Sequence, residues 1–329
     1  MTLYDNHNRP LTYLRLSVTD RCNLRCFYCM PPKGINWLPK SELLTFEEIL
    51  RTVQLLVQLG IRKIRITGGE PFVRTDLMQL LRKLAGIPGV EEIHITTNGV
   101  LTAPFVPALK QLGIASVNLS LDTLNEKRFA EITHRNELKK VLQTLELLLY
   151  HQIPVKINAV VMEGKNEEDI YPLIELARNQ PVSVRFIEEM PFNGSGPHYI
   201  TLNWNHKKIL EHIRQAYPHL KKLPQEPGAT SATYHIPGFA GTIGIIAAYS
   251  RTFCGSCNRI RITAQGMLKT CLYDNGVLNV RDLIRIGKTN NEIIAELLKC
   301  FTRRPANGFE AEEKRRNMPV HESMATIGG

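Results

Sequence analysis

The sequence predicts an α/β protein built on a parallel β-sheet. Short apolar stretches with the alternation of strands recur between longer stretches of helical periodicity, giving six strands with five helices between them. Repeated βα units with right-handed crossovers produce a parallel sheet. The chain has 329 residues, 43% of them hydrophobic, which is enough for one large or two medium globular units. The periodicity leaves open whether the sheet is doubly wound or curls into a partial barrel.

The first strand is expected over Leu11–Val18, where Arg15 faces opposite to its apolar neighbours. The first helix is expected from Thr45, which forms a capping box with Glu48, to Gly60. Further strands are expected at Lys63–Thr67, Glu91–Thr96, Ser116–Leu121, Val155–Val161 and Val182–Ile187. Further helices are expected at Asp76–Leu84, Pro104–Leu112, Glu137–His151 and Glu167–Arg178. Beyond them we expect helices over Trp204–Tyr217 and Glu292–Phe301, irregular strands and turns over Ala229–Tyr249, and a partly mobile end over Ala306–Gly329.

The most distinctive motifs lie where the predicted strands end. A cysteine-rich loop follows the first strand, Gly-Gly-Glu-Pro at 68–71 follows the second, Thr-Asn-Gly at 97–99 follows the third, and Asp122 closes the fourth. In parallel α/β proteins, ligands gather at the C-terminal ends of the strands. One end of the sheet is therefore the predicted site.

The cysteine-rich loop holds Cys22, Cys26 and Cys29 in C-x3-C-x2-C spacing. Soft sulfur ligands select zinc or an iron-sulfur cluster over harder ions. Structural zinc requires four ligands, and no fourth Cys or His lies nearby in the sequence, whereas a [4Fe-4S] cube held by three thiolates keeps one iron open. The spacing favours such a cluster. A zinc knuckle with a distant fourth ligand, or three unrelated thiols, are the alternatives.

A second trio consists of Cys254, Cys257 and Cys271. A zinc ribbon would repeat the C-x2-C pair, and here only one pair is present. Two separated trios indicate a two-cluster protein, and Cys300 is interpreted as a structural thiol. Seven cysteines in this pattern do not suit a disulfide framework, so reduced thiols and a cytoplasmic location are expected.

The net charge of +10 could mark a nucleic-acid surface, a phosphate-rich substrate or merely a basic surface. Lysines and arginines are dispersed, and their densest clusters, at 221–222 and 314–316, are small, so duplex binding is disfavoured. Residues 1–10 contain no apolar signal region, and no stretch approaches 18 apolar residues. Neither export nor a membrane span is expected.

The first trio, with Tyr28 before its last cysteine, has the spacing of the radical S-adenosylmethionine (SAM) superfamily. Nearly the whole chain further resembles the GTP 3′,8-cyclase family of molybdenum cofactor biosynthesis, through residues 14–22, 63–71, 185–188, 253–261 and the terminal Ile-Gly-Gly. The resemblance implies an incomplete (β/α)6 TIM-like barrel as a radical SAM core over 5–228. It also implies a C-terminal region, 229–329, that carries a second Fe-S cluster, covers the barrel mouth and ends in a Gly-Gly tail.

The resemblance also implies the site residues. It places one [4Fe-4S] cluster on Cys22, Cys26 and Cys29 and another on Cys254, Cys257 and Cys271. It places SAM at Tyr28, Gly69, Ser120 and Met190, and GTP at Arg15, Arg65, Thr96, Lys156, Arg259 and Arg261. It assigns Gly328 and Gly329 to a tail that assists the reaction. The residue chemistry is consistent, because Gly69 permits close backbone approach and guanidinium groups match phosphate oxygens. The alternatives are a core hydroxyl for Ser120, a core methionine for Met190 and a frayed terminus.

The activity that the resemblance implies is that of a lyase. A 5′-deoxyadenosyl radical made from SAM would take the ribose 3′ hydrogen of GTP, and the product would be (8S)-3′,8-cyclo-7,8-dihydro-GTP. An external electron donor is implied, with transfer of the product to the cyclic pyranopterin monophosphate synthase, and the chain would be a monomer or homodimer. Two other hypotheses are a different radical SAM enzyme with an auxiliary cluster, such as a peptide-modifying one, and a zinc-containing nucleic-acid-binding module, which would show steep salt dependence.

Overall fold

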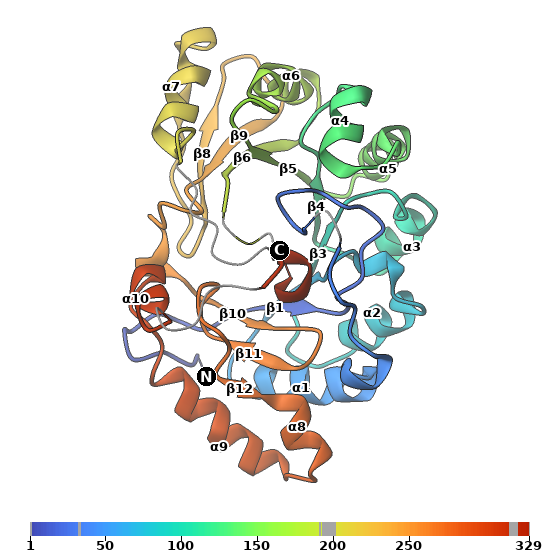
Figure 1. Cartoon of the computed structure of the whole chain (residues 1–329), viewed down its shortest axis with the longest axis vertical. Coiled ribbons are helices and arrows are strands. Elements are labelled where there is room, and N and C mark those ends of the chain that lie inside the picture. Colours follow the sequence, from blue (N-terminus) through green and yellow to red (C-terminus); the bar gives the residue numbers. More distant parts are fainter. Residues whose placement is uncertain (1, 32–33, 191, 193–201, 316–321, 329) are drawn as a thin grey trace.

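A computed structural model describes residues 2–31, 34–190, 192, 202–315 and 322–328 of the chain (Figure 1). Its centre is a run of six parallel strands that pair in sequence order. They are β1 (Tyr13–Ser17), β2 (Lys63–Thr67), β3 (Glu92–Thr97), β4 (Ser116–Ser120), β5 (Val155–Val161) and β6 (Ser183–Glu188). All six strands therefore lie where the sequence predicts them.

Helices cover the outer face of this curved sheet (Figure 1). They are α1 (Phe46–Gln58), α2 (Leu77–Ala85), α3 (Val106–Gln111), α4 (Glu126–Thr133), α5 (Leu138–Tyr150) and α6 (Ile170–Asn179). Short 3-10 turns lie at Lys40–Glu42, Pro71–Val73, Ala103–Phe105, Glu167–Asp169 and Cys254–Ser256. The predicted capping box at the start of α1 is present, because Thr45 and Glu48 each bond the backbone of the other.

The expectation of five helices between the strands is wrong, because α4 is an additional helix between β4 and α5. It is capped by Asn125, whose side chain accepts a hydrogen bond from the Arg128 amide. Its eight residues bury only Phe129, Ile132 and Thr133, so its apolar periodicity is too short to stand out in the sequence.

The C-terminal part of the chain extends the same sheet at both edges. β9 (Thr242–Ile246) pairs parallel with β6, and β8 (Ser231–His235) and β7 (Lys221–Lys222) continue antiparallel beyond it. At the other edge, β10 (Arg259–Ile262) pairs parallel with β1, followed by the antiparallel β11 (Met267–Lys269) and β12 (Leu278–Asn279). The stretch predicted as irregular, 229–249, thus contains regular strands. β8 pairs with its sequence neighbour β9, whereas the other partner of β9 is the more distant β6, and local alternation alone does not reveal that pairing.

In the described ranges, the sheet has twelve strands with β12 and β7 at its two ends, so the barrel is partial, as predicted. The division at residue 228 stays a prediction, and the pairing of β7 with β8 crosses it. The remaining helices are α7 (His206–Ala216), α8 (Val280–Arg285), α9 (Asn290–Phe301), α10 (Gly308–Glu313) and α11 (Met324–Ile327). α11 lies in the middle of the barrel in Figure 1. None of the helices in the described parts is long and apolar enough to cross a membrane.

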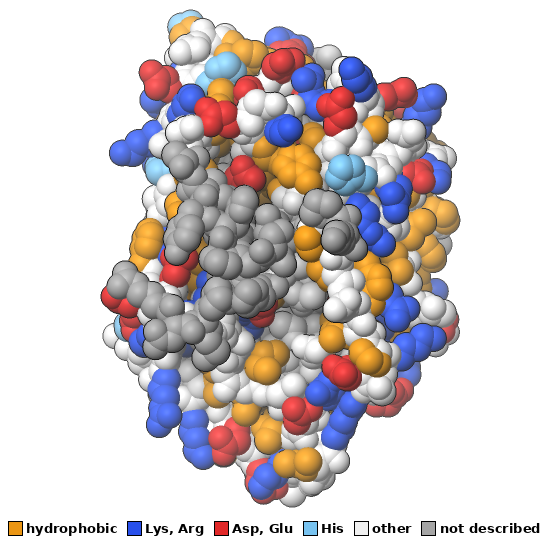
Figure 2. All heavy atoms as spheres, in the orientation of Figure 1, with side chains coloured by type: hydrophobic (Ala, Val, Ile, Leu, Met, Phe, Trp, Pro, Cys, Tyr) orange, Lys and Arg blue, Asp and Glu red, His pale blue; other side chains and the backbone are white. Residues whose placement is uncertain are grey.

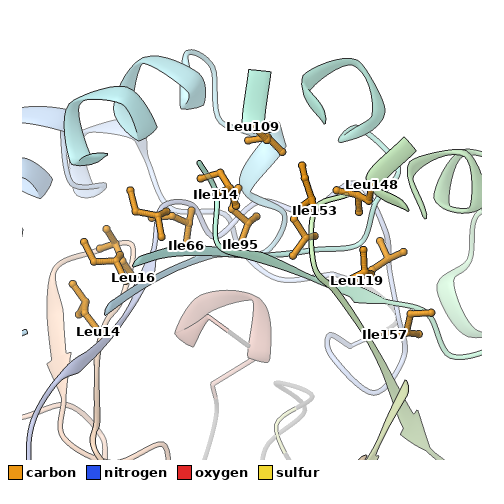
Figure 3. Close-up of a cluster of buried hydrophobic side chains, with 14 of the residues drawn as sticks. Leu14, Leu16, Ile66, Ile95, Leu109, Ile114, Leu119, Leu148, Ile153 and Ile157 are labelled. Carbon is orange, nitrogen blue, oxygen red and sulfur yellow. The ribbon is translucent and has the colours of Figure 1, made fainter. Parts of the chain in front are cut away.

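The main apolar core lies between the sheet and the outer helices. Figure 3 shows Leu14 and Leu16 of β1 beside aliphatic side chains of β2 to β5, with Leu109 of α3 and Leu148 of α5 above them. Because strand side chains alternate, Arg15 faces the opposite side, the barrel interior, as the sequence predicts. The same alternation therefore separates the stabilising core from the inner cavity.

The outer surface carries both signs of charge. Figure 2 shows lysine and arginine side chains interspersed with aspartate and glutamate around the face in view. This agrees with the dispersed basic residues of the sequence.

Replacing Leu16 by alanine tests the outer core. Leu16 is fully buried among aliphatic side chains, so Leu16→Ala is expected to lower the free energy of unfolding by about 2–5 kcal/mol. Urea unfolding of the cofactor-free protein measures the loss. As a control, Tyr150→Ala removes a side chain that is 80% exposed and should change the free energy by less than about 0.5 kcal/mol. Equal effects of the two substitutions would contradict this description of the core.

Candidate functional site

A cavity of about 980 Å³ occupies the inside of the barrel. Its walls come from the inner faces of the strands, the loops after them, and the C-terminal region. The predicted site residues that line it are Arg15, Cys22, Cys26, Tyr28, Cys29, Arg65, Gly69, Thr96, Ser120, Lys156, Met190, Cys254, Cys257, Arg259, Arg261 and Cys271. The fold thus brings both cysteine trios and the basic residues to one place. Their individual roles stay predictions.

The first trio occupies the loop after β1. The amide of Cys29 donates to the carbonyl of Cys26 at 2.9 Å, so the loop folds back on itself. Asn98, after β3, donates its side-chain amide to the Cys22 sulfur at 3.7 Å. Burial raises the pKa of Cys22 to about 11 and that of Cys29 to about 12. Such thiols stay protonated until a cation compensates the thiolate charge.

Gly69 is packed against the backbone of this cysteine loop. Its amide donates to the Thr19 carbonyl at 2.8 Å. A Cβ atom added at Gly69 would lie 2.7 Å from the Asp20 carbonyl oxygen and closer still to that of Arg21. Only a glycine therefore allows the two loops to approach in this way.

Glu70 connects the loops that follow β2 and β3, a role that the sequence analysis missed. Its buried carboxylate accepts hydrogen bonds from the amides of Phe72 and Asn98 and from the Thr97 hydroxyl. Burial raises the pKa of Glu70 to about 7 against the effect of these donors. The Gly-Gly-Glu-Pro motif was the available signal, since the motif begins directly after the strand.

The predicted SAM-contacting residues stand beside the first trio. The Tyr28 hydroxyl donates to Asp122 at 2.8 Å, and Asp122 also accepts from the amide of Val160. Burial raises the pKa of Asp122 to about 6. Ser120 ends β4 on the cavity wall, and Met190 packs against a small buried cluster that includes Phe192. Tyr28 is thus anchored across the barrel by a side chain that the sequence analysis noted only as a strand end.

The second trio lies in a more basic environment. Arg259 places a guanidinium nitrogen 3.4 Å from the Cys257 sulfur. Burial alone would raise the pKa of Cys257, but the charges of Arg259 and Arg304 lower it to about 7. Burial raises the pKa of Cys271 to about 11. One of the three thiols is therefore close to ionisation at neutral pH before any metal binds.

Three of the predicted GTP-contacting arginines lie side by side. In the sheet register, Arg15 of β1 is opposite Arg65 of β2 on one side and Arg261 of β10 on the other. Burial and the neighbouring arginines hold the pKa of Arg15 well below its usual value and lower that of Arg261 to about 10. The Nε atom of Arg15 is buried and has no hydrogen-bond partner in the described structure. This wall is suited to bind an anion.

Other lysines and arginines, which the sequence analysis did not single out as nucleotide contacts, line the cavity as well. Lys63, Arg185 and Lys269 join Lys156 there. Burial, followed by the charge of Arg185, lowers the pKa of Lys156 to about 8. Strand alternation was a usable signal, because Lys63 is two residues from Arg65 and therefore faces the same side of β2.

The C-terminal segment enters the cavity region. The carbonyl of Gly328 accepts a hydrogen bond from Arg261, and the Ser323 hydroxyl donates to the Cys29 carbonyl. Gly328 has φ of 76° and is packed so closely on Thr67 that a Cβ atom would overlap the hydroxyl. Residues 322–328 thus contact both the first cysteine loop and the arginine wall, while Gly329 lies outside the described residues.

The thiol chemistry of the two trios is suited to iron-sulfur clusters. Within the described ranges, no group of three or more His, Cys, Asp and Glu side chains is arranged to hold one metal ion. The thiolates of a cube each bind a different iron, so they need not meet at one point. Each trio also offers free thiols on a cavity wall with space beside them for a further ligand.

Known sequences are similar along the whole chain. The Radical SAM superfamily matches residues 16–177, and the family Molybdenum Cofactor Synthesis C matches residues 182–309. The GTP 3′,8-cyclase of Desulforamulus reducens is 39% identical over 329 residues, which cover 99% of this chain and 100% of that protein. The mitochondrial GTP 3′,8-cyclase of Arabidopsis thaliana is 38% identical over 311 residues, covering 92% of this chain and 77% of the relative.

Other relatives are longer. Molybdenum cofactor biosynthesis protein 1 of Drosophila melanogaster is 43% identical over 302 residues, covering 92% of this chain and 53% of that protein. The chain spans about half the length of this relative and of its mammalian counterparts.

Among solved structures, SuiB of Streptococcus suis has a TM-score of 0.63 with 14% identity, covering 93% of this chain and 73% of that one. SuiB bound to S-adenosylmethionine gives a TM-score of 0.61 with 15% identity, covering 94% of this chain and 69% of that one. This likeness supports the fold.

The close packing at Gly69 can be tested by adding one methyl group. Gly69→Ala is expected to displace the cysteine loop, lowering the free energy of unfolding by about 1–3 kcal/mol and reducing the iron that the protein retains after anaerobic reconstitution. Iron analysis and urea unfolding measure the two effects. Gly86→Ala is the matched control, because its Cβ atom would meet its nearest neighbours at 3.5 Å, an ordinary contact. Unchanged iron and stability in Gly69→Ala would show that the loops are not in close contact.

Proposed function

Because the chain belongs to the GTP 3′,8-cyclase family, we propose that it is a lyase that converts GTP to (8S)-3′,8-cyclo-7,8-dihydro-GTP. This is the first step of molybdenum cofactor biosynthesis. One observation carries the proposal: two cysteine trios line the same cavity, and buried arginines and lysines form the wall beside them. A nucleoside triphosphate is a ligand whose charge and length suit such a chamber.

The proposed cofactors are SAM and two [4Fe-4S] clusters. Cys22, Cys26 and Cys29 would hold the cluster that binds SAM, and the second trio would hold the cluster that faces the guanine base. When bound, the reduced first cluster and SAM supply a 5′-deoxyadenosyl radical, the hydrogen-abstracting group of the reaction. The protein contributes placement and exclusion of water.

The chain's own residues position the two ligands. At the SAM side, Gly69 permits backbone contact, and Ser120 and Met190 provide a hydroxyl and a thioether on the wall. Tyr28 is held by Asp122, so the loop that carries the first trio keeps one orientation. These residues would hold SAM beside the first trio.

At the GTP side, the cations of the cavity wall would neutralise the triphosphate. Arg15, Arg65 and Lys156 project from separate strands into the same cavity, with Thr96 beside them. Arg259 and Arg261 lie next to the second trio and would orient the nucleotide there. Gly328, bonded to Arg261, and Gly329 would form the tail that assists the reaction. The ribose would then lie between the two cofactors.

The reaction needs partners beyond the substrate. We propose an external electron donor for the first cluster and transfer of the product to the cyclic pyranopterin monophosphate synthase of the pathway. The proposed setting is the cytoplasm, with the chain as a monomer or homodimer and without nucleic acid or membrane as partners. The free thiols of all seven cysteines support a reducing compartment.

Deuterium transfer tests the reaction directly. The anaerobically reconstituted protein, given SAM, a strong reductant and GTP deuterated at C3′, should produce 5′-deoxyadenosine that carries deuterium. Mass spectrometry of the nucleoside measures the label. The matched control is GTP deuterated at C8, which should leave 5′-deoxyadenosine unlabelled. Unlabelled product from the C3′-deuterated substrate would reject the assigned chemistry.

Lys156 should make GTP binding depend on pH. Its pKa is lowered to about 8 in the free protein, and the negative triphosphate would raise it. Below pH 8 the lysine is protonated in both the free and the GTP-bound protein, so it does not make the affinity for GTP depend on pH. Above pH 8 binding must take up a proton, and affinity should fall by up to about tenfold per pH unit. Calorimetry from pH 7 to 9 without reductant measures this.

Two variants complete this test. Lys156→Gln should bind GTP more weakly at pH 7 and lose the extra decline above pH 8. Lys139→Gln, which alters a side chain that is 89% exposed, should keep the wild-type profile. A parallel decline in wild type and Lys156→Gln would show that another group causes it.

A further inference from the structure

We propose that Arg304 is a positioning residue for the second trio, which holds a buried positive charge against its sulfur atoms and raises the reduction potential of the cluster bound there. The inference rests on the proposed function, because it requires a cluster on Cys254, Cys257 and Cys271. Arg304 belongs neither to the motifs found in the sequence nor to the predicted GTP-contacting residues.

Arg304 connects the two segments that carry the second trio. Its guanidinium donates to the carbonyl of Arg259 at 2.9 Å and to the carbonyl of Thr270 at 3.0 Å. It also lies 3.4 Å from the Cys257 carbonyl and 3.9 Å from the Cys257 sulfur. Since Thr270 directly precedes Cys271, one side chain fixes the spacing between the C-x2-C turn and the third cysteine.

The N-terminal segment orients this arginine. Asp5 accepts from Arg304 and from Arg9, both at 2.7 Å, and its side chain is 0% exposed. Arg9 in turn donates to the carbonyls of Cys254, Pro305 and Ala306. Asp5 and Arg9 therefore contact both Arg304 and the C-x2-C turn of the second trio.

The charges of Asp5, Arg9 and Arg304 do not cancel one another. Two arginines and one aspartate carry a net positive charge, and all three side chains are at most 5% exposed. A buried net charge is costly unless a partner compensates it. Three thiolates around an oxidised [4Fe-4S] core would carry one net negative charge, and reduction would add another. The buried cation therefore favours the reduced cluster.

Arg259 also contacts the Cys257 sulfur, but the two arginines differ. Both side chains line the cavity, and the difference lies in their hydrogen bonds. Arg259 donates to the Gly228 carbonyl and to the Cys257 sulfur. Arg304 is 3% exposed and directs its three guanidinium nitrogens to the backbone, to Asp5 and to sulfur. Its charge is committed to the trio and would not be released to bind substrate.

Redox titration followed by electron paramagnetic resonance tests the inference. The full chain is used with Cys22, Cys26 and Cys29 replaced by serine, so that any cluster signal comes from the second trio. In this background Arg304→Gln should shift the reduction equilibrium about tenfold toward the oxidised cluster. For a one-electron couple, this lowers the reduction potential by about 59 mV. Arg304→Lys keeps the charge and should shift it less. Arg303→Gln, at the exposed neighbouring position, should leave it unchanged.

Asp5→Asn provides an independent measurement if Arg304→Gln does not fold. It removes the negative member of the group, so the potential should become less negative. Unchanged potentials in Arg304→Gln and Asp5→Asn would overturn the inference. If Arg304→Gln is insoluble, an unchanged or more negative potential in Asp5→Asn would overturn it. If the background chain binds no iron and shows no cluster signal, while the unsubstituted chain holds about four irons instead of eight, the proposed two-cluster function fails.

Discussion

The structure depends on one constraint: several positive charges lie inside the barrel, and the apolar core between the sheet and the outer helices stabilises it. Arg15, Arg65 and Arg261 occupy adjacent strands in register, and neighbouring strands are only about 4.8 Å apart. Their partners in the described structure, such as the Tyr13 hydroxyl and the Gly328 carbonyl, are neutral oxygen atoms that compensate little of the charge. Burying these like charges is unfavourable, and the aliphatic layer on the other face of the same strands supplies the stabilising free energy that offsets it. An anion that entered the cavity would be bound by positive charges that folding has already placed and desolvated.

The position of the second trio follows from one strand pairing. β10 adds to β1 in parallel, with Tyr13 opposite Arg259, and this register fixes Cys257 two residues before that pair. Because the first cysteine loop leaves the other end of β1, a single short strand relates the two trios. The strand pairing therefore positions the segments from which both trios extend, which is the kind of support that a site with two cofactors needs.

Much of this could be predicted from local pattern, and the remainder depends on contacts that local pattern does not contain. Alternation on β1 gave both the outer leucines and the inward Arg15, and the spacing of the cysteines gave both trios. α4 was missed because its apolar face is short, and the pairing of β9 with β6 because the two strands are far apart in sequence. Glu70 and Arg304 were missed for the same reason. Each of them acts through hydrogen bonds to backbone atoms of distant segments, such as Asn98 and Thr270, which become neighbours only in the folded chain.

The surroundings of the two trios differ in a way that fits different proposed roles. Near the first trio the ionisable neighbours include the buried acids Glu70 and Asp122, and these raise the pKa values of Cys22 and Cys26 beyond the effect of burial. Near the second trio, Arg259 and Arg304 lower the pKa of Cys257. Where these acids are ionised, their negative charge disfavours added electrons on a cluster, so a reduced first cluster would be a strong electron donor. Positive surroundings would hold electron density at the second cluster, whose proposed task is to bind the substrate. In the proposed function, the end of the cavity at the first trio would release electrons and the end at the second trio would bind the anionic substrate.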